Sequence, residues 1–200
     1  MALTLFHTAD VHIARFDAIR DRIAPHVELC HINRPDWLSR ARQGDATVDA
    51  ECLTAFAIAG PALCSCTTLG PLADQAGIVR IDRPMMQQAA ETAGNILLAY
   101  CVDSTAEASR ALLNECIGNR PVRVTTLPIL EAWPLFEGGD NAGYAAKIAH
   151  RIREHAAGHD CILLGQASMD VAAPLLADLP IMTPAETAFI AALDRSRASR

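Results

Sequence analysis

Two stretches of the chain decide the fold: Leu63-Cys64-Ser65-Cys66-Thr67-Thr68-Leu69 and Leu163-Leu164-Gly165-Gln166-Ala167-Ser168-Met169. Each stretch passes from apolar residues into small polar ones, and 100 positions separate Cys66 from Gln166. A short apolar run and a proline that can open a helix, Pro84 or Pro184, follow each of them. The chain therefore reads as two similar halves, in which one loop carries a thiol where the other carries an amide.

Short apolar runs that end in small or polar residues predict the strands. They are Leu3–His7, Val27–Ile32, Ala62–Cys64, Ile78–Ile81, Ile96–Cys101, Val122–Thr126, Cys161–Leu164 and Leu179–Met182. Helical patterns lie between them, at Ile13–Ile23, Val48–Ala59, Met85–Thr92, Ala106–Cys116, Ala142–Ala157 and Ala185–Leu193. The segment Leu127–Asp140 interrupts this order with prolines and glycines, and we expect an irregular excursion there, either a lid or a plain surface connection.

Strands that alternate with helices predict right-handed βαβ units and parallel sheets. Because the strands of the two halves match in order, we expect an α/β protein of two lobes, each with a four-stranded parallel sheet. The predicted limits are 1–92 for the first lobe, which carries Cys66, and 93–182 for the second, which carries Gln166. Residues 183–200 form a last helix that is free to pack back on the first lobe.

Composition restricts the partners and the location of the protein. Hydrophobic residues make up 51% of the chain but aromatic ones only 4%, which suits helices packed on parallel sheets. A net charge of −6 without a concentrated basic face argues against nucleic acid. No apolar run approaches the roughly 18 residues of a membrane span, and His7 and Asp10 follow too early for a signal peptide. The seven scattered cysteines fit a reduced, cytoplasmic setting.

The loops that follow the strands are the candidate site, because ligands of open parallel sheets bind beyond the carboxyl ends of the strands. Hydroxyl groups and the N–H groups of helix starts suit an anion, so Thr67, Thr68 and Ser168 are candidates to hold a carboxylate. The same residue types also cap helices, which is the alternative interpretation. The four loops are Thr8-Ala9-Asp10, Cys64 to Thr68, Asp103-Ser104-Thr105 and Gly165 to Met169.

Cys66 is the strongest candidate for a reactive thiol, because a helix that follows a thiol favours the thiolate, which is the reactive form. Cys64 is expected inside the strand, whereas Cys101 ends the first strand of the second half and could border the site. One Cys-x-Cys pair without a second pair does not have zinc spacing, so no metal is expected. The remaining cysteines are expected to be small core residues: Cys30, Cys52, Cys116 and Cys161.

One competing motif is His7-Thr8-Ala9-Asp10-Val11-His12, which resembles the opening Asp-x-His of the calcineurin-like metallophosphoesterases. The later metal motifs of that family are missing. Gly44-Asp45 and Gly139-Asp140-Asn141 offer only fragments of them, so a two-metal site cannot be completed.

Three segments together resemble the aspartate/glutamate/hydantoin racemase superfamily. They are Cys66-Thr67-Thr68-Leu69-Gly70, Val79-Arg80-Ile81-Asp82-Arg83-Pro84-Met85 and Ile162-Leu163-Leu164-Gly165-Gln166-Ala167-Ser168-Met169. Their order and spacing carry the resemblance, which extends over nearly the whole chain. It implies two flavodoxin-like (Rossmann-like) lobes related by pseudo-twofold symmetry, with the substrate between them and no pyridoxal phosphate or metal. Members racemise amino acids or hydantoins, isomerise maleate or decarboxylate arylmalonates.

The resemblance implies proton transfer at a carbon next to a carboxylate. Cys66 matches the first catalytic cysteine of the two-thiol racemases, and Asp10 falls where the family often places a polar group near that thiol. The residues that would bind a small carboxylate substrate are Thr8, Thr67, Thr68, Ser104, Thr105, Gln166 and Ser168.

The chain departs from the racemases at Gly165-Gln166-Ala167, where they have Gly-Cys-Thr. An amide cannot act as a general acid or base at neutral pH, although it can bind an enolate-like oxygen. The expected reaction is therefore one-thiol proton transfer or decarboxylation. Racemisation stays open if Cys101 or another residue replaces the second thiol.

Two other classes of function stay open. A carboxylate-binding module could have kept the site and lost turnover, and a redox protein could use Cys64 and Cys66. A pKa of Cys66 well below about 8.5, the free-thiol value, would favour the enzyme over the module. A free-thiol count that does not respond to reductant would exclude the redox protein. A homo-oligomer is compatible with the sequence.

Overall fold

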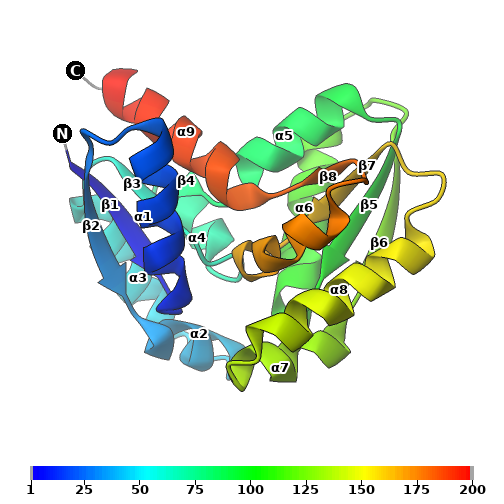
Figure 1. The fold of residues 1–200 in the computed structure, drawn as a ribbon. Coiled ribbons are helices and arrows are strands. Elements are labelled where there is room, and N and C mark those ends of the chain that lie inside the picture. Colours follow the sequence, from blue (N-terminus) through cyan, green and yellow to red (C-terminus); the bar gives the residue numbers. More distant parts are fainter. Residues whose placement is uncertain (1, 199–200) are drawn as a thin grey trace. The chain divides into compact units, whose positions relative to one another are not determined.

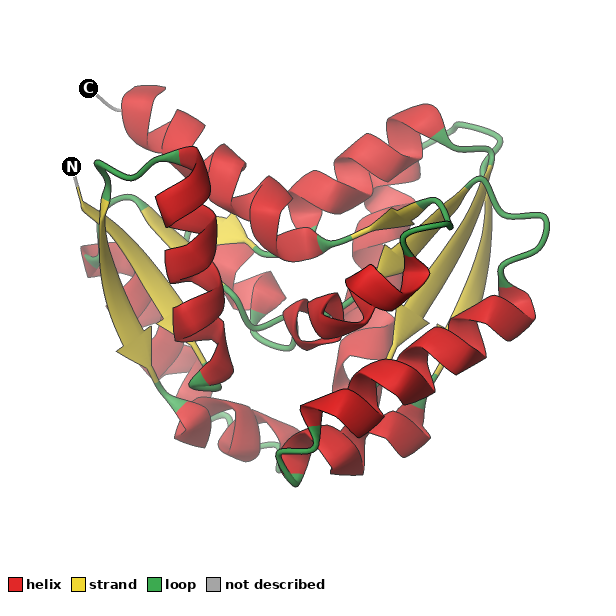
Figure 2. Cartoon of the chain, in the orientation of Figure 1, coloured by secondary structure: helices red, strands yellow, loops and turns green. Residues whose placement is uncertain are grey.

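The computed structural model describes residues 2–198, which form two compact α/β units (Figures 1 and 2). Of the described residues, the first unit comprises 2–81 and 185–198, and the second comprises Asp82–Pro184. The domain limits expected from the sequence differ from these units chiefly at residues 82–92, which by their contacts lie in the second unit. Those limits stay a prediction.

The sheet of the first unit has four parallel strands in the order β2-β1-β3-β4. Its strands are β1 (Ala2–His7), β2 (Glu28–Asn33), β3 (Ala62–Cys64) and β4 (Val79–Arg80). Its helices are α1 (Val11–Ile23), α2 (Pro35–Arg42), α3 (Thr47–Ile58), α4 (Gly70–Gln75) and the last helix, α9 (Pro184–Ala198).

The centre of this sheet is buried on both faces, which explains the apolar runs of β1 and β3. Leu3, Leu5 and Leu63 are fully buried. On one face, Phe6, Cys64 and Cys66 join the rings of Trp37 and Phe56 in a core cluster. Helix α9 belongs to this unit by its contacts, among them an ion pair at 2.6 Å between Arg22 and Glu186.

The second unit repeats the arrangement with the strand order β6-β5-β7-β8, again all parallel. Its strands are β5 (Asn95–Tyr100), β6 (Arg123–Pro128), β7 (Cys161–Leu164) and β8 (Ile181–Met182). Its α-helices are α5 (Arg83–Thr92), α6 (Asp103–Ile117), α7 (Trp133–Glu137) and α8 (Asn141–His155), and 3-10 helices span η1 (Leu130–Ala132) and η2 (Ala167–Leu176). The predicted fold class, two α/β lobes with four-stranded parallel sheets, is confirmed.

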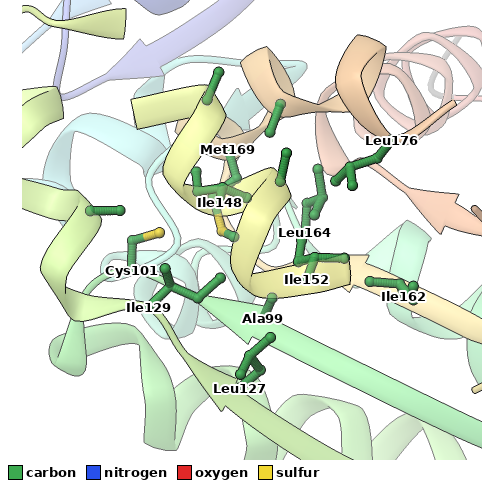
Figure 3. Close-up of a cluster of buried hydrophobic side chains, with 14 of the residues drawn as sticks. Ala99, Cys101, Leu127, Ile129, Ile148, Ile152, Ile162, Leu164, Met169 and Leu176 are labelled. Carbon is green, nitrogen blue, oxygen red and sulfur yellow. The ribbon is translucent and has the colours of Figure 1, made fainter. Parts of the chain in front are cut away.

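Alternate residues of β5 supply two separate cores, as the period of a strand requires. Leu97 and Ala99 face a cluster that also contains residues of β6, α8, β7 and η2, with Cys101 just beyond the strand (Figure 3). Ile96 and Leu98 face the opposite cluster, beneath α5 and α6. Burial on both faces explains why this strand reads as a continuous apolar run.

The predicted strands overlap all eight observed strands, but several helices escaped prediction. Helices α2, α4 and α7 are short, and each carries a proline at its start. The segment Leu127–Asp140 is not irregular: it forms η1 and α7, and Leu127, Ile129 and Ala132 are buried in the core of the second unit. Among the helices of residues 2–198, none is long and apolar enough to cross a bilayer.

Candidate active site

The loop of Cys66 leaves the sheet at the carboxyl end of β3. Ser65 extends the pairing with β1 by one residue, since its N–H donates to the Phe6 carbonyl at 2.9 Å. The chain then turns, with the Leu69 N–H donating to the Cys66 carbonyl at 3.2 Å, and α4 begins at Gly70. The carboxyl ends of β1 and β3 thus bring Thr8 and Cys66 together, and the Thr8 side chain is hydrogen-bonded to the Cys66 sulfur.

The Cys66 thiol lies among hydrogen-bond donors but has little contact with solvent, being 7% exposed. Burial raises the pKa of this thiol. Hydrogen bonds from the Thr8 side chain, the Leu69 N–H and Thr68 act in the opposite direction. The N–H groups that precede α4 therefore favour the thiolate, but burial has the larger effect, so the pKa of Cys66 is raised overall.

Asp10 lies at the start of α1, yet its carboxylate does not cap the helix. It accepts a hydrogen bond from Asn33 Nδ2 at 2.5 Å, which joins the ends of β1 and β2. The other side-chain atom of this amide, Asn33 Oδ1, is buried and has no hydrogen-bond partner. Asp10 is exposed, so it is available to a ligand.

Arg80 in β4 is a functional candidate that the sequence analysis missed. Its side chain is 4% exposed, pairs with Asp74 at 3.2 Å and lies against Gly70, where a Cβ atom would come within 2.5 Å of Arg80 Nε. The guanidinium therefore supports the turn between Cys66 and α4, and it explains why a glycine follows Leu69. A charged residue inside an apolar run was the signal in the sequence.

The loop of Gln166 occupies the corresponding place in the second unit. The Gly165 N–H donates to the Ala99 carbonyl at 2.8 Å, as that of Ser65 does to Phe6 in the first unit. This match makes Gln166 the counterpart of Cys66, and it makes Cys101 the counterpart of Thr8. Gln166 is 7% exposed, and its Oε1 accepts the backbone N–H of Cys101 at 2.6 Å.

Cys101 does not border an open site, because its thiol is buried in the core (Figure 3). Burial raises its pKa to about 12, although a hydrogen bond with Tyr144 acts in the opposite direction. The Tyr144 hydroxyl also lies 3.0 Å from Ser168 Oγ. Tyr144, which the sequence analysis did not single out, thus connects two of the predicted site residues.

Of the remaining predicted residues, two lie at the start of α6 and two in the Cys66 loop. Ser104 is exposed, while the buried Thr105 hydroxyl donates to the Val102 carbonyl at 2.7 Å. Thr67 is buried and Thr68 is half-buried, both in the Cys66 loop. The roles of Thr8, Thr67, Thr68, Ser104, Thr105, Gln166 and Ser168 in binding a substrate stay predictions.

The seven cysteines are all free thiols. Cys52, Cys64 and Cys161 are buried, as expected for core residues. Two expectations are wrong: Cys30 is exposed because it lies on the edge strand β2, which alternates in exposure, and Cys116 on α6 is only half-buried.

No group of three or more His, Cys, Asp or Glu side chains able to hold a metal occurs within residues 2–198. His12, the third residue of the Asp-x-His motif, is buried and its Nδ1 lies 3.1 Å from Arg15 Nη1. Since an arginine only donates, this nitrogen accepts a hydrogen bond and is not available to a metal.

Comparison of the sequence finds no matching family profile and no matching curated protein. Solved structures do match. The aspartate racemase of Picrophilus torridus is similar with a TM-score of 0.77 at 14% identity, over 98% of this chain and 94% of that one. The glutamate racemase of Francisella tularensis, solved with D-glutamate, gives 0.75 at 10% identity, over 99% and 81%. An arylmalonate decarboxylase gives 0.52 at 12% identity, over 98% and 92%.

This chain therefore shares its fold with these two racemases and the decarboxylase, which is the two-lobe fold that the resemblance of the three segments implied. Identities of 10–14% show a shared fold, so activity has to be argued from the residues of this chain.

Proposed function

We propose that this protein catalyses cofactor-independent proton transfer at a carbon next to the carboxylate of a small substrate, with Cys66 as the acid–base group. The observation that carries the proposal is the surroundings of the Cys66 sulfur. A thiol at the carboxyl end of a central strand receives hydrogen bonds from Thr8, Thr68 and the Leu69 N–H. Such donors stabilise the thiolate, which is the form that removes a proton from carbon.

Burial gives this thiol a second useful property. Because the pKa of Cys66 is raised, the protonated thiol is its resting form, which can deliver a proton to a carbanion left by decarboxylation, and the thiolate is a stronger base once formed. The hydroxyl groups of Thr67 and Thr68 in the same loop are the proposed ligands of the substrate carboxylate. Asp10, which is exposed at the end of β1, is the proposed polar group that supports the thiol.

The second unit supports a one-thiol reaction over a two-thiol racemase. Gln166 cannot carry a proton at neutral pH, and its amide oxygen already accepts the Cys101 N–H. Cys101 is buried among apolar side chains, and a thiol with a pKa near 12 stays protonated. Protonation after decarboxylation, or proton exchange at one face of the carbon, needs only Cys66.

A carboxylate-binding module without turnover is the second candidate. It is favoured by the same burial of Cys66, since a thiol that never ionises would serve only as part of a binding loop.

The experiment that separates the two candidates is proton NMR in D2O with a panel of small amino, hydroxy and malonic acids. We expect loss of an α-proton signal, or decarboxylation, that falls by about 10²–10⁴ in Cys66→Ala. Cys52→Ala is the matched control, because it removes another buried thiol from the same core cluster. Exchange with retained configuration supports one-thiol chemistry, and racemised product would contradict it. Saturable binding without exchange or decarboxylation would favour the module.

A further inference from the structure

The side chain of Gln166 makes one hydrogen bond and leaves its second polar group without a partner. Its Oε1 accepts the backbone N–H of Cys101 at 2.6 Å, just beyond the end of β5. Because a backbone N–H can only donate, this bond fixes which corner of the amide is the oxygen and which is the NH2 group. The side chain therefore has a defined orientation, in which Nε2 is the remaining polar atom.

The NH2 group of Gln166 finds no acceptor within residues 2–198. Gln166 as a whole is 7% exposed, yet Nε2 is not among the polar atoms of these residues that are both sealed from solvent and unpartnered. Solvent or a ligand therefore reaches this buried side chain at its NH2 group. A buried donor without a protein partner indicates that something else accepts its hydrogen bond.

Hydrogen bonds hold the backbone on both sides of this amide. The Gly165 N–H donates to the Ala99 carbonyl at 2.8 Å, and the Met169 N–H donates to the Gln166 carbonyl at 3.0 Å. Together with the bond from Cys101, they fix the NH2 group before any ligand arrives. A donor that is already in place loses little conformational entropy when it binds, so it binds an acceptor more tightly than a mobile one does.

The surroundings of Gln166 favour an oxygen anion over an ammonium group. Gln166 is the residue directly before η2, and its side chain does not cap this ten-residue helix. The start of a helix attracts an anion, and the Gln166 NH2 group adds two N–H donors at the same place. The acceptor end of the amide faces Cys101, so an ammonium group, which only donates, gains no partner from Gln166.

We propose that the Gln166 loop binds a carboxylate of the substrate and does not bind an ammonium group. This inference rests on the proposed function, in which Thr67 and Thr68 bind one carboxylate. A substrate that offers a second carboxylate to Gln166 is a dicarboxylic acid of the malonic type, whereas an α-amino acid has an ammonium group in its place. Gln166 is then a specificity-determining residue that takes no part in proton transfer.

The first test is NMR of the folded protein, labelled with 15N in its glutamine side chains and titrated with malonate, acetate or glycine. The three probes share one carboxylate and differ in the second group on the carbon, which is a carboxylate, a hydrogen or an ammonium. We expect malonate to shift the Gln166 NH2 signals saturably and to bind at least about 10-fold more tightly than the other two, as one additional charge-assisted hydrogen bond allows. Glycine that binds as tightly as malonate, or malonate that leaves the Gln166 signals unmoved, would overturn the proposal.

The second test is the malonate affinity of Gln166→Glu. The variant keeps an oxygen to accept the Cys101 N–H but replaces the NH2 group by a second oxygen. We expect the affinity to fall about 10²-fold, because a charge-assisted hydrogen bond is replaced by repulsion between two carboxylates. An unchanged affinity would mean that Gln166 only holds the backbone of Cys101 in place.

Gln88→Glu, at an exposed glutamine of α5 in the same unit, is the matched control. It makes the same change of charge away from the loop and should leave the affinity unchanged, and an equal loss in both variants would contradict the proposal.

Neither test requires Cys66 or turnover, so the two proposals can fail separately. Malonate that binds at Gln166 but neither loses carbon dioxide nor exchanges its methylene protons would contradict the proposed function and leave this inference standing. Exchange of the α-proton of an amino acid that depends on Cys66 would support the proposed function and overturn this inference.

Discussion

The loops of Cys66 and Gln166 have the same backbone hydrogen bond to the neighbouring central strand, but one presents a thiol and the other an amide. In the first unit, the Ser65 hydroxyl is hydrogen-bonded to His7, which is bonded in turn to His31. The Cys66 sulfur receives hydrogen bonds from Thr8, Thr68 and the Leu69 N–H. In the second unit, Gly165 has no side chain to donate, and the Gln166 amide bonds to the backbone of Cys101. The two units thus share a backbone arrangement but differ in their side chains. The Cys66 loop has polar side-chain partners, whereas the Gln166 amide bonds to the backbone.

The thiols of the two units show the difference most directly. In the first unit, Cys66 follows β3, and the residue after β1 that contacts its sulfur is Thr8. In the second unit the positions are exchanged. Cys101 follows β5, the counterpart of β1, and Gln166 follows β7, the counterpart of β3. Cys101 packs into an apolar core beside the Tyr144 hydroxyl, whereas the Cys66 sulfur receives hydrogen bonds from Thr8, Thr68 and the Leu69 N–H.

Acid should destabilise the first unit much more than the second. Burial lowers the pKa of His7 and of His12 to about 3, whereas both titrate near 6.5 when unfolded. The unfolded chain therefore binds more protons below pH 6.5, so this stability is complete above pH 6.5 and is lost as the pH falls toward 3. Between pH 7 and pH 5 we expect a loss of about 2 kcal/mol for each histidine.

Urea titrations at the two pH values can follow each unit separately, because each contains one tryptophan. Trp133→Phe leaves Trp37 to report the first unit, and Trp37→Phe leaves Trp133 to report the second. Equal shifts of the two unfolding midpoints would contradict the assignment of the acid-sensitive groups to the first unit.

Gly165→Ala should be the most damaging single substitution in the Gln166 loop. An added Cβ would lie 2.7 Å from the Ala99 carbonyl oxygen, which already accepts the Gly165 N–H. Both the Cα that would carry the new Cβ and the Ala99 oxygen belong to the backbone, so neither can move without breaking the pairing of β7 with β5. We expect a loss of about 3 kcal/mol in the unfolding free energy of the second unit, measured by urea titration. A stable variant would show that this loop is less constrained than that of Cys66.

Gly70→Ala should cost less, about 1–2 kcal/mol, although the added Cβ would come within 2.5 Å of Arg80 Nε. The obstacle here is a side chain, and the guanidinium can shift at the expense of its ion pair with Asp74. A double-mutant cycle with Arg80→Met measures this coupling, and the alanine should be nearly neutral in that background. A penalty that persists without Arg80 would place the strain elsewhere in the turn.

Tyr144→Phe should have the smallest effect, about 1 kcal/mol, and only on the second unit. The substitution removes the hydroxyl that lies 3.0 Å from Ser168 Oγ and that also contacts Cys101. Tyr100→Phe serves as the control, because it removes the only other tyrosine hydroxyl of the chain. An equal effect of the two variants on urea unfolding would show that the Tyr144 network adds nothing particular.

The two α/β lobes and the place of the Cys66 loop after a central strand could be predicted from the sequence. Apolar runs such as Leu63–Cys64 and Ile162–Leu164 can only be buried as central parallel strands, and the order of elements then leaves few topologies. Short elements were missed, since α4 and α7 have too few residues for a helical period to emerge.

The chemistry of the site could not be predicted in this way, because it depends on contacts between distant parts of the chain. The contacts that define the site join residues from different elements. Gln166 bonds to Cys101, and Arg80 packs against Gly70. Ser65 is linked to Asp17 by hydrogen bonds through His7 and His31. The pKa of Cys66 also depends on how much protein surrounds the sulfur, which no local pattern records. Periodicity reports which residues are buried, whereas reactivity depends on which of them become neighbours.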